Sequence, residues 1–263
     1  KMTMGQGYAI LYGGVPMPDF IVRRDPNSEN YIVATFNTFA SERDRRVEVI
    51  HYNSKNEVVS KSYLSTPDDK YKFVNILDVA VMEDKEAYAL IYAYNTKKSG
   101  GKEEDLILAK FTKNAENVEY KILDLEDGYK VSDGIIKHNK VTNKLHILTQ
   151  VLVSTKTKRP LFAGSYTNSL YALTHYIYDS KTNNVNTLGE INLSSIDNKY
   201  KELFGKKEDF SAVLQNFYIN DDGGFSIILE GVKTVVNERS NYSANSGYSG
   251  TRTSYQYYLT DIG

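Results

Sequence analysis

Apolar and polar residues alternate with a period of two along most of the chain, and segments with helical spacing are scarce. Such alternation is typical of β-strands that bury one face. The predicted strands recur in one order: a strand, a short turn, a second strand, a longer polar loop, a third strand, a short turn and a fourth strand. We therefore predict an all-β protein built from repeats of a four-stranded antiparallel unit.

The repeating unit is roughly 50–60 residues long, except at its last step. The extra length there comes from 194–207, where apolar residues follow a helical spacing and Gly205 can end a helix. We predict one short helical insert near 195–205 and an incomplete fourth repeat. The predicted repeats cover about 19–66, 73–126, 131–194 and 211–263.

Four antiparallel strands in a repeat of this length are typical of a propeller blade, which buries its faces by packing against other blades. In this order of turns and loops the chain resembles, over nearly its whole length, the degenerate β-propeller repeat proteins of bacterial envelope or secreted type. It has no Trp-Asp pair, kelch Gly-Gly or Asp-box motif. A β-sandwich is the alternative architecture. We prefer a single propeller-like domain because the turn–loop–turn order recurs in register.

Three full repeats and a partial one are too few for a typical ring. The pattern also runs into Gly263 within a predicted strand, and Lys1 does not look like a native start. We therefore expect that this chain is a piece of a longer polypeptide, with further blades elsewhere.

Composition argues against several kinds of partner and cofactor. Lys+Arg 32 and Asp+Glu 33 give a net charge of -1 with the signs interspersed, which does not suit nucleic acid. No apolar run approaches the roughly 18 residues of a membrane span. The chain has no Cys, and its histidines show no close ligand spacing, so we expect no metal and no cofactor. Tyr is unusually common, at 22 residues, whereas Trp is absent.

The loops that join second to third strands should all leave the repeats at one end, and irregular loops on a repeat scaffold are common binding sites. The last loop, 237–254, contains Tyr242 and Tyr248 among Ser, Gly and Asn, and Tyr255 follows directly after it. That composition suits adaptable recognition, and equally suits a disordered loop. Arg43 and Arg45 in the first loop lie beside acidic residues, a pattern more typical of solvated ion pairs than of an anion site. The candidate ligand-binding residues are Tyr242, Tyr248, Tyr255, Arg43 and Arg45.

The chain contains no Gly-x-Ser-x-Gly elbow, His-Glu-x-x-His helix or Gly-rich phosphate loop, so catalytic residues cannot be assigned. The resemblance implies a non-catalytic binding or scaffolding module of an exported or cell-envelope bacterial protein. Such a module would contact a protein or glycan through the long-loop face. One alternative is a propeller-fold hydrolase or lyase with acidic residues and histidines converging at the blade axis. Another is a subunit of a larger membrane-associated assembly.

Overall fold

The computed structural model describes residues 20–36, 45–67, 70–96, 98, 101, 103–113, 118–126, 129–153, 170–205, 212–220, 222–242 and 249–260. This part of the chain is mostly strand, and every strand pairing is antiparallel. Three sheets have four strands in sequence order, and a fourth sheet has three. The predicted all-β array of three full blades and one partial blade is therefore confirmed. None of the described helices is long and apolar enough to cross a membrane.

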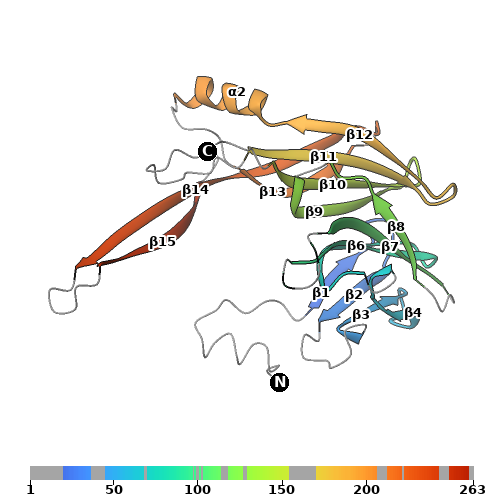
Figure 1. The fold of residues 1–263 in the computed structure, drawn as a ribbon. Coiled ribbons are helices and arrows are strands. Elements are labelled where there is room, and N and C mark those ends of the chain that lie inside the picture. Colours follow the sequence, from blue (N-terminus) through green and yellow to red (C-terminus); the bar gives the residue numbers. More distant parts are fainter. Residues whose placement is uncertain are drawn as a thin grey trace. The chain divides into compact units, whose positions relative to one another are not determined.

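The chain divides into two compact units, Lys1–Ile191 with Ile219–Gly224 and Asn192–Tyr218 with Phe225–Gly263. The first unit contains the three four-stranded sheets, which we call blades 1 to 3 (Figure 1). Blade 1 consists of β1 (Phe20–Arg24), β2 (Tyr31–Phe36), β3 (Val47–Tyr52) and β4 (Val58–Tyr63). Blade 2 consists of β5 (Phe73–Met82), β6 (Glu86–Tyr94), β7 (Glu104–Thr112) and β8 (Glu119–Leu123). Blade 3 consists of β9 (Tyr129–Asn139), β10 (Lys144–Val153), β11 (Leu170–Asp179) and β12 (Asn184–Asn192).

The first strands of the three blades are neighbours, since β5 contacts both β1 and β9. This arrangement is that of consecutive propeller blades, in which the first strand lies innermost and each blade packs face to face on the next. A sandwich would instead bury one face of each of two sheets. Blade 2 is covered on both faces, and this explains the nearly unbroken apolar sequence of β6.

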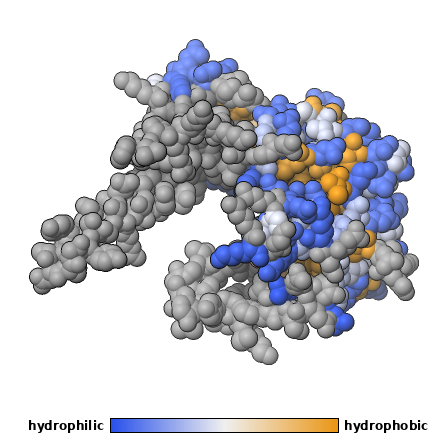
Figure 2. Space-filling model, in the orientation of Figure 1, coloured by the Kyte–Doolittle hydropathy of each residue, from blue (hydrophilic) through white to orange (hydrophobic). Residues whose placement is uncertain are grey.

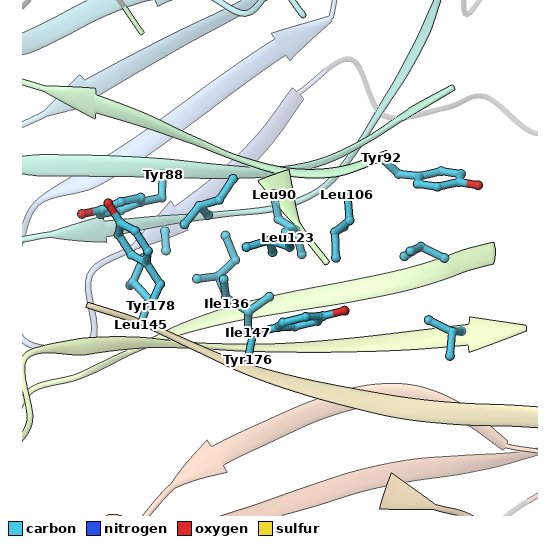
Figure 3. Close-up of a cluster of buried hydrophobic side chains, with 14 of the residues drawn as sticks. Tyr88, Leu90, Tyr92, Leu106, Leu123, Ile136, Leu145, Ile147, Tyr176 and Tyr178 are labelled. Carbon is cyan, nitrogen blue, oxygen red and sulfur yellow. The ribbon is translucent and has the colours of Figure 1, made fainter. Parts of the chain in front are cut away.

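Alternate residues of β6 belong to two separate cores. Ala87, Ala89 and Ile91 pack toward blade 1, whereas Tyr88 and Leu90 pack toward blade 3. Figure 3 shows the core between blades 2 and 3: leucine and isoleucine side chains fill its centre, and tyrosines lie at its two ends. Apolar residues also reach the surface, and Figure 2 shows patches of them between hydrophilic areas.

The second unit contains the predicted short helix, α2 (Ser194–Phe204), which ends at Gly205 with φ 60°. Its sheet consists of β13 (Ala212–Ile219), β14 (Phe225–Tyr242) and β15 (Ser249–Thr260). The expected long loop at 237–254 is wrong for most of its length, because β14 and β15 pair from Gly231↔Thr260 to Tyr242↔Ser249. The expectation of a single domain with the repeat limits given above stays a prediction.

Candidate binding surface at the long-loop ends of the blades

In blades 1 to 3 the second strand ends, and the third begins, at the same end of the sheet, which we call the long-loop end. The hairpin turns lie at the opposite, short-turn end. Asx side chains organise these turns: Asn53 Oδ1 accepts hydrogen bonds from the backbone N–H groups of Lys55 and Glu57, and Asn139 Oδ1 accepts two in the same way. The turns predicted from these Asn and Asp residues are present.

The residues singled out from the sequence are scattered over the two units. Tyr242 is the last residue of β14, opposite Ser249, and Tyr255 of β15 is opposite Val236. Arg45 is exposed, with its guanidinium carbon 6.0 Å from the centre of the Tyr63 ring. Tyr248 and Arg43 lie outside the described residues. Ligand binding by any of these five residues stays a prediction.

A row of aromatic rings, which sequence reasoning did not single out, lies at the long-loop end of blade 2. Phe73 of β5 is paired with Tyr94 of β6, and their ring centres are 5.3 Å apart with planes inclined by 21°. Tyr92, two residues earlier on β6, continues the row at 5.6 Å from Tyr94. Alternate residues of a strand share a face, so the Tyr-x-Tyr pattern was the available signal.

The row continues toward blade 3 along the same core. Tyr94, Leu125 and Tyr129 are partly buried and pack against the core between blades 2 and 3. Figure 3 shows Tyr92 at the end of this core opposite Tyr88 and Tyr178, and the buried Tyr176 with its hydroxyl directed toward the Tyr92 end. We define the aromatic patch as Phe73, Tyr92, Tyr94, Leu125 and Tyr129.

Carboxylates accept the tyrosine hydroxyls of this patch. Tyr92 donates to Glu104 Oε2, and Tyr129 donates to Glu190 Oε2 at 2.8 Å. The hydrogen bond to Glu190 raises the pKa of Tyr129 to about 12, and burial together with Glu104 raises the pKa of Tyr92. Both phenols therefore stay protonated and remain donors at neutral pH.

The innermost strands hold a second polar group, which links all three blades. Asp78 of β5 is buried and accepts Arg23 Nε of β1 at 2.8 Å and the backbone N–H of Ile136 in β9 at 3.1 Å. Burial raises the pKa of Asp78, although Arg23 acts in the opposite direction. Both carboxylate oxygens are thus engaged in contacts between blades, so this acid is a structural bridge rather than a free catalytic group.

All four histidines of the chain lie toward the short-turn end. His138 Nδ1 is 3.3 Å from the Asn27 side-chain amide of blade 1, and His51 Nε2 is 3.0 Å from the backbone carbonyl oxygen of Glu83 in blade 2. His146 and His175 form a buried pair with ring nitrogens 3.2 Å apart. Among the described residues, no group of three or more His, Asp or Glu side chains could hold a metal ion.

The chain matches no protein-family model and no curated protein.

Proposed function

We propose that this chain is a non-catalytic binding or scaffolding module of an exported or cell-envelope bacterial protein, and that it contacts a protein or glycan through the long-loop ends of its blades. The observation that supports this most is the aromatic patch, in which Phe73, Tyr94 and Tyr129 are partly exposed and Tyr92 is buried behind them, at that end of blades 2 and 3. Phe73 is 38% exposed, and such rings supply a large contact area at a small cost in conformational entropy.

The contrast between the two ends of the blades also supports this proposal. At the short-turn end, Asp25 is buried and accepts hydrogen bonds from Ser28 Oγ and from the backbone N–H of Glu83. Groups used in this way hold turns and blades together and are not available to a partner. At the long-loop end, Glu104 and Glu190 instead accept tyrosine hydroxyls at the border of the partly exposed rings of the patch, and a polar rim around rings is common at interfaces.

The experiment is retention of the purified chain on immobilised bacterial polysaccharides and on immobilised envelope proteins. The Phe73→Ala/Tyr94→Ala variant should lose retention. The matched control is Tyr31→Ala/Tyr52→Ala, which removes another stacked cross-strand pair, 4.9 Å between ring centres, from the short-turn end of blade 1. Circular dichroism checks that both variants fold.

Equal retention by the patch variant and the native chain would contradict the proposal. Release of sugars or peptides from the immobilised material would support the hydrolase or lyase alternative instead.

A further inference from the structure

The aromatic patch is bordered by carboxylates that form no ion pair with any residue that the structure describes. Glu104 and Glu190 contact Tyr92 and Tyr129 as described above. The backbone carbonyl oxygens of Glu126 and Asp124 accept the Tyr129 N–H and, at 2.9 Å, the Tyr176 hydroxyl, which places both residues at this end of the core; both residues are exposed. None of these four carboxylates forms an ion pair with a residue in the described part of the chain.

The rings themselves favour positive charge. A phenol that donates its proton to a carboxylate makes its ring more electron-rich, and the faces of Tyr and Phe rings attract ammonium and guanidinium groups. The chain already uses this attraction nearby: Lys72 Nζ is 5.9 Å from the centre of the Phe73 ring, and Lys70 Nζ is 4.9 Å from that of Tyr71.

We propose that the aromatic patch docks a basic peptide segment of a partner protein, with Lys or Arg side chains on its rings and against its four carboxylates. This inference rests on the proposed function, because it names the partner of the same surface. A peptide is favoured over a single small cation because the carboxylates come from separate elements, β7, the segment after β8, and β12. A chain carrying several cations can meet several separated charges at once. A neutral glycan would leave these charges without compensation.

The test is fluorescence anisotropy of a labelled oligo-arginine peptide, with an oligo-glutamine peptide and a soluble neutral polysaccharide as comparison probes. Glu104→Gln/Glu190→Gln removes two patch charges while keeping oxygens that can accept the tyrosine hydroxyls. We expect about tenfold weaker binding of oligo-arginine by this variant, and weaker binding by the native chain at high salt. Phe73→Ala/Tyr94→Ala should weaken binding by a similar factor.

The control is Glu57→Gln/Glu119→Gln, which removes the same charge from exposed positions at the short-turn end of blades 1 and 2. It should change the affinity by less than about twofold, because those charges lie far from the patch on the scale of salt screening. If both charge variants lost the same affinity for oligo-arginine, the inference would be overturned, because the peptide would then respond only to the net charge of the chain.

The glycan probe separates the two proposals. Binding of the neutral polysaccharide, lost in Phe73→Ala/Tyr94→Ala and unchanged in Glu104→Gln/Glu190→Gln, would overturn the basic-peptide inference and leave the proposed function standing. Retention on the immobilised materials that does not depend on Phe73 and Tyr94 would overturn both.

Discussion

Replacing His175 with Gln should remove much of the acid sensitivity of this fold. Asn139 Oδ1 accepts two backbone N–H groups, so its Nδ2 faces His146 Nε2, 3.4 Å away. His146 Nε2 must then accept, and its Nδ1–H donates to His175 Nε2. Protonation of either ring would place two donors against each other, so the folded pair is neutral.

Burial, and secondarily His146, lowers the pKa of His175 from 6.5 to about 4, and burial lowers the pKa of His146 as well. The unfolded His175 has a pKa of 6.5 and the folded His175 a pKa of about 4. Between these two values the unfolded chain binds more protons than the folded chain, so the free energy of unfolding falls as the pH falls. For His175 alone the loss from above pH 6.5 to about pH 4 is about 3 kcal/mol, at roughly 1.36 kcal/mol per pKa unit. Above pH 6.5 the protein keeps this part of its stability in full.

The assay is urea unfolding followed by circular dichroism across this pH range, because the chain has no Trp to serve as a fluorescent probe. Gln does not titrate, and its oxygen can accept the His146 Nδ1–H. The free energy of unfolding of the His175→Gln variant should therefore be about 1 kcal/mol below that of the native chain at neutral pH. It should also decline less steeply toward pH 4. His138→Gln is the matched control, since it removes a histidine of the same end that lies outside the pair. An unchanged pH slope in His175→Gln would refute the reasoning.

Asp78→Ala should lower the free energy of unfolding by about 3 kcal/mol, because the buried backbone N–H of Ile136 loses its acceptor. In the same urea titration, Asp78→Asn should lower the free energy of unfolding by less than Asp78→Ala does. An equal decrease in both variants would contradict the bridging role. Gly134→Ala would place a Cβ 2.7 Å from Leu90 Cδ2, so we expect a loss of about 1–3 kcal/mol that is partly relieved in a double variant with Leu90→Ala. Asn143→Val should lower the melting temperature more than Asn143→Gly, because both variants lose the oxygen 3.2 Å from His138 Nε2 but only Val is strained at a φ of 54°.

The alternation of apolar and polar residues was sufficient to predict the blades, but not every limit of a strand. β9 begins at Tyr129, before the predicted start of the third repeat at about 131, because Tyr129, Lys130 and Val131 pair with the end of β10 beyond a bulge. Charged residues in this stretch weakened its strand pattern. Pairing is decided by the partner strand, which a local pattern does not contain.

The segment 237–254 shows the same effect more strongly. Its Ser, Asn and Gly residues are typical of loops, and this suggested a long loop. In the structure both arms pair continuously, with Val236 opposite Tyr255 and Ser240 opposite Thr251. Thr, Val and Tyr favour strands, and backbone hydrogen bonds between two arms require no apolar side chains. Composition alone could not distinguish a polar hairpin from a flexible loop.

The predicted strand order indicated which end of the blades would carry the candidate surface. It did not indicate which residues form that surface. Tyr129 and Glu190 are 61 residues apart and meet because β9 and β12 belong to one sheet. In the sequence, acidic residues and histidines were assigned a catalytic role only in the hydrolase or lyase alternative. The structure engages Asp25 and Asp78 in hydrogen bonds between blades, whereas Glu104 and Glu190 accept the Tyr92 and Tyr129 hydroxyls and form no ion pair with a described residue. The buried acids thus hold the blades together, whereas the proposed task of the acids at the long-loop end is to meet a partner.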